Sequence, residues 1–282
     1  MFLLGLPNKA NCIGGNLVIN VKKETFLLVL LVVINFLLEL SVFSEIQAAL
    51  NISGMQGLFF YKTCSLISLL CLNYFITKQT IYFRFKMSAN IVKAMLLLPA
   101  VFFIFFIAGS KNIPAAFSIG ILGAVPEEYL FRGIVLAKML RLFAVKLNNQ
   151  KLNMIISAIL SSAAFGAMHL INLSHQPLGF TVAQMAQTFG FGMLLAAVYL
   201  KSGSIVFPML VHFALDSIVI LMVGYSKAMS GSQHVSVLLT IVMLGIYTSI
   251  SVGMILDSNE NKLLKKIWKN TYGVNEAGEV TK

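Results

Sequence analysis

Charged residues are scarce in this chain. Only 11% of its 282 residues are Asp, Glu, Lys or Arg, whereas 58% are hydrophobic. Soluble globular proteins carry about 25% charged residues and about 45–50% apolar ones. Too few polar side chains are present to cover a soluble fold of this size. The composition therefore predicts a single all-α domain that crosses a membrane several times.

Cysteine and acidic residues are also few. The three cysteines form no CxxC pair and are odd in number, which excludes a disulfide framework and a zinc finger. Lys and Arg outnumber Asp and Glu by 21 to 10, but they lie between the apolar runs. Orientation signals and contacts with anionic lipid have that placement. We therefore expect membrane lipid as a partner and no nucleic acid.

Eight apolar runs approach the length of about 20 residues that a helix needs to cross a bilayer. They are expected at Thr25–Phe43, Gly57–Ile76, Ile91–Ala108, Ala115–Ala137, Leu152–Leu173, Gly179–Leu200, Ser204–Gly224 and Val235–Leu256. They predict a membrane domain over residues 25–256, between an N-terminal tail (1–24) and a charged C-terminal tail (257–282).

The basic residues predict the orientation of the chain. With eight crossings, every loop rich in Lys and Arg lies on the same face, so both termini are expected on the cytoplasmic side of the cell membrane. The KLLKKIWK stretch of the C-terminal tail suits an interfacial helix, and a short solvated tail is the alternative.

Three charged residues interrupt the fourth run, in the stretch AVPEEYLFRG. Charges inside membrane helices are costly, so they usually face an interior and serve a function. Glu128 and Arg132 are four residues apart and are expected to form an ion pair, because Arg keeps its charge when buried. Glu127 has no counterion in its own helix, so we expect it to be unpaired and suited to act as a general base. Lys62, on the second run, is expected to extend toward the lipid headgroups instead.

Two histidines lie inside later runs. Phe165 precedes His169 by one helical turn, so its ring can cover or stack on the imidazole. His212 and Asp216 are four residues apart on one helix face, where a carboxylate can orient an imidazole. Two such histidines together with the acid pair are harder to explain as packing residues than either histidine alone.

Three motifs thus follow one another on three predicted helices: Glu127-Glu128-x-x-x-Arg132, Phe165-x-x-x-His169 and His212-x-x-x-Asp216. They resemble the motifs of the CAAX protease and bacteriocin-processing family, also called the Abi family, of intramembrane endopeptidases. The resemblance extends over about residues 113–224. It implies an all-α fold of about eight transmembrane helices with a conical active-site cavity inside the membrane.

The resemblance also implies catalytic roles. Glu127 and His169 would hold and deprotonate the attacking water, while Glu128 and Arg132 would pair to position their helix. His212 would line the oxyanion side of the site.

Asp216 would lie on that oxyanion side as well, at a position that is often Asn in the family. An ionised Asp cannot donate a hydrogen bond, so Asp216 either stays protonated or orients His212 instead.

No cofactor is expected. The alternative is Zn²⁺, for which Glu127, His169 and His212 would be the ligands. These residues lack the His-Glu-x-x-His spacing that builds a zinc site on one helix.

The expected function is an intramembrane endopeptidase acting on a membrane-associated peptide or protein. Its substrate would be a bacteriocin or signalling-peptide precursor, or the protein would give self-immunity against such peptides. A CAAX-type prenyl-protein endopeptidase is one alternative, and a catalytically silent membrane scaffold is another. A proton-coupled transporter fits less well, because the chain shows no repeated halves. A partner membrane protein is left open.

Overall fold

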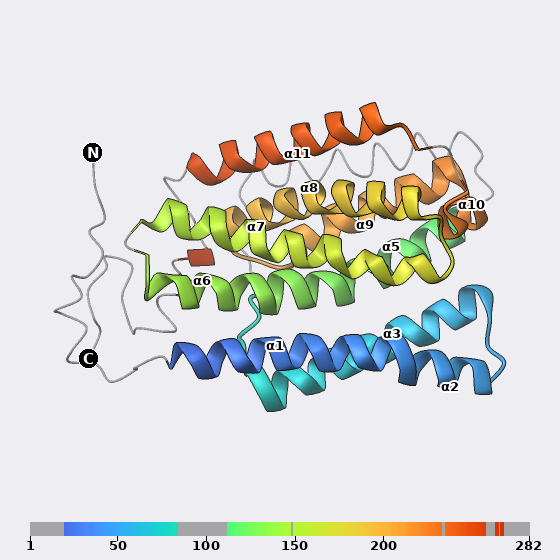
Figure 1. Ribbon diagram of the computed structural model, residues 1–282, viewed down its shortest axis with the longest axis horizontal. Coiled ribbons are helices and arrows are strands. Elements are labelled where there is room, and N and C mark those ends of the chain that lie inside the picture. Colours follow the sequence, from blue (N-terminus) through green and yellow to red (C-terminus); the bar gives the residue numbers. More distant parts are fainter. Residues whose placement is uncertain are drawn as a thin grey trace.

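The computed structural model describes residues 20–83, 112–147, 149–232, 235–257, 263, 264, 266 and 267. Within these ranges the chain is helical and contains no strand, as the sequence predicted (Figure 1). The helices run roughly along one long axis and alternate in direction.

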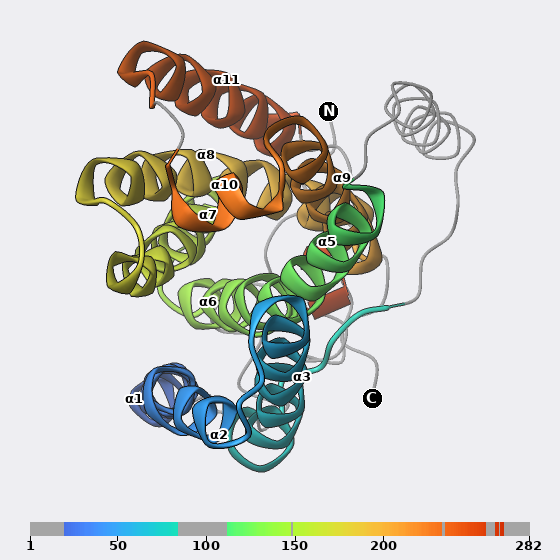
Figure 2. The same ribbon diagram turned by 90° about the vertical axis from the view of Figure 1, so that its right-hand side faces the viewer.

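An N-terminal helical hairpin forms the lower layer in Figures 1 and 2. Its first arm consists of α1 (Val21–Leu37), the π-helical η2 (Leu38–Phe43) and α2 (Ser44–Ala49). Its second arm consists of α3 (Gly54–Leu72) and η3 (Asn73–Thr77). Asn20 caps α1 by accepting a hydrogen bond from the backbone N–H of Lys23.

The segment bearing the acid pair follows as α5 (Ile113–Glu128), η4 (Tyr129–Leu136) and α6 (Ala137–Ala144). Pro126 lies inside α5, and a π-helical segment begins three residues after it. Proline removes a backbone donor, and π-helical turns are wider than α-helical ones and frequent at functional sites. All eight residues of η4 are buried, so this widened segment lies in the interior of the protein.

The remaining helices are α7 (Gln150–Met168), the 3₁₀-helix η5 (His169–Ser174), α8 (Leu178–Ser202), α9 (Val206–Val223), α10 (Tyr225–Ser230) and α11 (Val237–Leu256). Helix α8 packs between α7 and α11, and α9 packs along α5. Small residues permit the close contact of α5 with α9: a Cβ on Gly120 would lie 2.8 Å from the backbone oxygen of Phe213.

Within the part of the chain that the structure describes, six helical stretches are long and apolar enough to cross a membrane: Val21–Ala49, Gly54–Thr77, Gln150–Ser174, Leu178–Ser202, Val206–Val223 and Val237–Leu256. The chain is thus a multi-pass membrane protein. The α5–η4–α6 segment, which carries the buried charges, is not among the six. The span expected at Ile91–Ala108 lies outside the described residues.

The described part of the C-terminal tail differs from both expectations for KLLKKIWK. Leu263, Leu264 and Ile267 are buried in the same hydrophobic cluster as Leu140 and Leu200. The side chain of Lys266 donates a hydrogen bond to the carbonyl of Gly203 at 2.6 Å. These residues therefore pack on the protein rather than on lipid or in water, because the ends of α6 and α8 offer them an apolar surface.

Candidate active site

A water-excluded ion pair lies at the junction of α5 and η4. Arg132 Nη1 is 3.0 Å from Glu128 Oε1, and both side chains are completely buried. Arg132 Nη2 also donates to the carbonyl of Gly192 on α8 at 3.2 Å. Glu128 Oε1 in turn lies 2.9 Å from Nδ1 of His212. This pair, predicted from the four-residue spacing, therefore ties η4 to α8 and α9.

The ring of Phe165 joins the charged residues to both imidazoles. Its centroid is 5.2 Å from that of His169 and 5.8 Å from that of His212, in edge-on contact with each. Arg132 lies over the same ring, with its guanidinium carbon 4.5 Å from the centroid. The two histidines, on separate helices, thus both contact one aromatic side chain.

The end of α7 orients His169. The helix changes from α to 3₁₀ at this residue, and Nδ1 lies 3.0 Å from the carbonyl oxygen of Phe165. A carbonyl can only accept a hydrogen bond, so Nδ1 must carry the proton. In a neutral ring the lone pair is then on Nε2, the nitrogen that is free to accept a proton.

Glu127 is not unpaired, contrary to the expectation from sequence. Lys62 of α3 donates a hydrogen bond from Nζ to Glu127 Oε1 at 2.6 Å. Lys62 does not reach the headgroup region, because the acid on α5 offers it a closer partner. Spacing within one helix predicts only counterions from that helix, whereas Lys62 lies 65 residues before Glu127 in the chain.

A second polar network borders Lys62. Glu39 Oε1 accepts hydrogen bonds from Asn35 Nδ2 at 3.0 Å and from Ser65 Oγ at 2.5 Å. Tyr61, the residue before Lys62, donates its hydroxyl to the Glu39 backbone carbonyl at 3.2 Å. Glu39 is therefore held between the two arms of the N-terminal hairpin.

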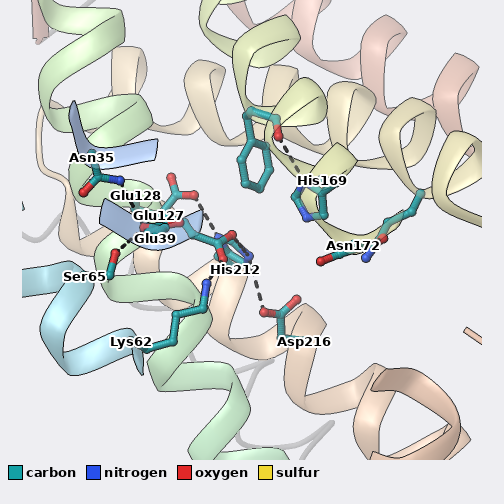
Figure 3. Close-up of polar contacts among 12 residues, drawn as sticks. Asn35, Glu39, Lys62, Ser65, Glu127, Glu128, His169, Asn172, His212 and Asp216 are labelled. Atoms are coloured by element: carbon teal, nitrogen blue, oxygen red, sulfur yellow. Dashed lines mark hydrogen bonds and ion pairs between the residues drawn. The ribbon is translucent and has the colours of Figure 1, made fainter. Parts of the chain in front are cut away.

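His212 lies between three carboxylates. Its Nε2 is 3.4 Å from Asp216 Oδ2 and 3.9 Å from Glu127 Oε2, while Nδ1 faces Glu128. Both ring nitrogens can donate to these oxygens only if the ring carries both protons. Figure 3 shows Glu127, Glu128 and Asp216 around this imidazole, with Lys62 reaching Glu127 from α3.

Exposure divides the polar cluster into two halves. Glu128 and Arg132 are fully buried and His212 is nearly so. Glu127 and Lys62 are each 23% exposed, and Asp216 is 31% exposed. The fully buried Glu128–Arg132 pair is suited to hold the helices together, whereas the partly exposed carboxylates beside His212 can meet water or a substrate.

Zn²⁺ draws no support from the described geometry. Among the described residues, no group of three or more His, Cys, Asp or Glu side chains could hold a metal ion. One oxygen of Glu127 is instead engaged by the Lys62 ammonium.

The conical active-site cavity that the family resemblance implies remains a prediction. A cavity of about 620 Å³ lies at the end of α3, beside η3. It is lined by Leu70, Asn73, Tyr74, Phe75, Lys78, Gln79 and Tyr129 rather than by the polar cluster.

Sequence reasoning missed Asn172. In a 3₁₀-helix, residues three apart lie on the same face, so η5 places Asn172 one turn beyond His169 on the side that His169 occupies. Its Nδ2 donates to Gln184 Oε1 of α8 at 3.0 Å. A purely α-helical reading of residues 152–173 hides this alignment, and no local sequence signal marks the change of helix type.

The fold and the site together define a multi-pass membrane protein with a cluster of ionisable side chains in its interior. The described residues include six candidate membrane spans, and ionisable groups from α3, α5, η4, η5 and α9 lie close to one another. Such groups inside a membrane usually mark sites of chemistry or transport.

Residues 108–218 match the family model described as type II CAAX prenyl endopeptidase Rce1-like, and this segment therefore belongs to that family. Membership implies an intramembrane protease with a protein or peptide substrate. No curated protein and no solved structure matches the chain.

Proposed function

We propose that this protein is an intramembrane endopeptidase that hydrolyses a peptide bond with water activated by Glu127 and His169. The observation that carries the proposal is the gathering of Glu127, His169 and His212 around Phe165 and the Glu128–Arg132 pair, within the segment that matches the protease family. Hydrogen bonds also orient both histidines. Nδ1 of His169 lies 3.0 Å from the carbonyl oxygen of Phe165, and Nδ1 of His212 lies 2.9 Å from Glu128 Oε1.

The reaction needs one proton acceptor and donors for the developing oxyanion. Water attacks the scissile carbonyl carbon while Glu127 takes one proton, with His169 Nε2 orienting the water. The carbonyl oxygen becomes negative and receives hydrogen bonds from His212 Nε2–H and from the second amide hydrogen of Asn172. When the C–N bond breaks, the proton on Glu127 passes to the leaving amine.

Asp216 then orients His212 instead of binding the oxyanion. Its Oδ2 lies 3.4 Å from His212 Nε2, so it accepts the Nε2–H hydrogen bond before the substrate carbonyl becomes negative. Nε2 carries a single hydrogen, so this hydrogen bond passes from Asp216 to the oxyanion when the oxyanion forms. Of the two roles that the sequence leaves open for Asp216, this one agrees better with the distance.

Two substrate classes fit this mechanism. One is a membrane-associated peptide precursor, such as a bacteriocin or signalling peptide, and the other is a prenylated protein C-terminus. The description of the matched family favours the prenylated class as the first to test. In both cases the site would act near the cytoplasmic leaflet, with both termini of the chain in the cytoplasm. The end of the bundle where α1 and α7 begin carries Lys22, Lys23 and Lys151, which supports this orientation.

Purified protein in liposomes should cleave an internally quenched peptide that ends in a farnesylated cysteine and three further residues. A matched peptide with an apolar leader in place of the prenyl group tests the precursor class. Glu127→Gln should abolish cleavage, while Glu45→Gln, at an exposed acid of α2, should leave it unchanged. A catalytically silent scaffold would cleave neither peptide, and its biological effect would survive Glu127→Gln.

A further inference from the structure

Lys62 lies outside the three motifs and outside the matched segment, yet it makes the shortest described contact to Glu127. We propose that Lys62 is a positioning residue that keeps the Glu127 carboxylate ionised and determines which of its oxygens accepts the proton from water. The inference rests on the proposed function, in which Glu127 is the general base.

The charges around Glu127 show why a cation is needed. Glu127, Glu128 and Asp216 are three acids within reach of His212, and Arg132 is engaged with Glu128. An acid among other acids in a poorly solvated site loses its charge by binding a proton unless a cation lies beside it. A protonated Glu127 could not take a proton from water.

The geometry of Glu127 assigns different tasks to its two oxygens. Oε1 receives the hydrogen bond from Lys62 at 2.6 Å. Oε2 lies on the side of His212, 3.9 Å from Nε2, which is too long for a direct hydrogen bond. Oε2 is therefore the oxygen that is free to accept the proton, and it faces the group assigned to the oxyanion.

The surroundings of Lys62 favour its charged form. Glu127 lies on one side, and Glu39 is close enough to attract the ammonium from the other. Asn35 and Ser65 donate hydrogen bonds to Glu39, which stabilise the negative charge of this second acid. His169 and His212 interact with Glu127 from the opposite side, and Tyr61 is adjacent to Lys62 in the chain. Arg132 is held by Glu128, and His212 Nε2 is 3.9 Å from Glu127. Among the described residues, Lys62 is therefore the cation in direct hydrogen-bond contact with Glu127.

Infrared difference spectroscopy in liposomes tests the inference without requiring activity. The spectrum of the wild type minus Glu127→Gln should contain the carboxylate bands of an ionised Glu127. With Lys62→Met, the corresponding difference against the Lys62→Met/Glu127→Gln variant should contain the carbonyl band of a protonated acid. Lys62→Arg retains the positive charge and should restore the carboxylate bands.

Cleavage of the farnesylated peptide gives the second readout. Lys62→Met should lower kcat by at least about 100-fold, the size of a lost general base, with little change in KM. Lys62→Arg should recover part of the rate. Lys138→Met is the matched control, because Lys138 also makes an ion pair between helices, with Glu24 of α1, but Glu24 is not one of the motif residues.

The outcomes separate this inference from the proposed function. An ionised Glu127 in the Lys62→Met variant would overturn the inference, whatever the activity. A rate for Lys62→Met equal to that of Lys138→Met would overturn it as well. A wild-type protein that cleaves neither peptide would refute the proposed function, whereas the infrared result would still decide whether Lys62 sets the charge of Glu127. Lys62→Gln replaces Lys62→Met if the methionine variant does not fold.

Discussion

Replacing Arg132 by methionine should destabilise the protein strongly. The substitution removes the ion pair with Glu128, the hydrogen bond to the Gly192 carbonyl and the stacking on Phe165, all in a fully buried position. Removing one partner of a buried ion pair costs about 3–5 kcal/mol, because the other charge is left without compensation. His212 still lies beside Glu128, so we expect a loss near 3 kcal/mol, the lower end of that range.

Equilibrium unfolding in mixed micelles measures this free energy. Lys201→Met is the control, since Lys201 pairs with Asp257 at 3.5 Å where Asp257 is 85% exposed, and exposed pairs contribute about 0–1 kcal/mol. The double variant Glu128→Gln/Arg132→Met should lose less than the sum of its single variants, because it removes both charges. A loss for Arg132→Met no greater than that for Lys201→Met, or additive losses in the double variant, would refute the reasoning.

Three further predictions concern activity on the peptide probes. Gly123→Ala should lower kcat/KM by about 10- to 100-fold, because its Cβ would lie 2.7 Å from Asp216 Oδ2 and displace that side chain, while Gly245→Ala has open space and should change nothing. Asn172→Ala should lower kcat by about 100-fold if its amide binds the oxyanion, and an unchanged kcat would remove it from the site. Cleavage should survive a metal chelator, because the Lys62 ammonium occupies one of the Glu127 oxygens that a zinc site would need; loss of activity that added Zn²⁺ restores would contradict this.

Hydropathy and spacing predicted much of the fold because they depend on local sequence. Runs of apolar residues predicted the spans that the structure describes, with ends displaced by a few residues, as for α8 at Leu178–Ser202 against the expected Gly179–Leu200. The ion pair of Glu128 and Arg132 was predictable because four residues make one helical turn.

Contacts between distant helices could not be predicted in the same way. No periodicity in the sequence predicts that Lys62 lies beside Glu127, because this contact depends on how the N-terminal hairpin packs against α5. The hydrogen bond from Ser65 to Glu39 likewise depends on how the two arms of the hairpin pack. The 3₁₀ turn that begins at His169 likewise depends on the surrounding helices. Reasoning within single helices therefore predicted the pair of Glu128 and Arg132 but missed Lys62 as the counterion of Glu127.

The most direct test of the account is cleavage of the peptide probe in ¹⁸O-labelled water, followed by mass spectrometry of both products. If water activated by Glu127 attacks the scissile carbonyl, the new carboxylate should contain one ¹⁸O atom after a single turnover, and Glu127→Gln should give no product. Cleavage by Glu127→Gln at the wild-type rate would contradict the account.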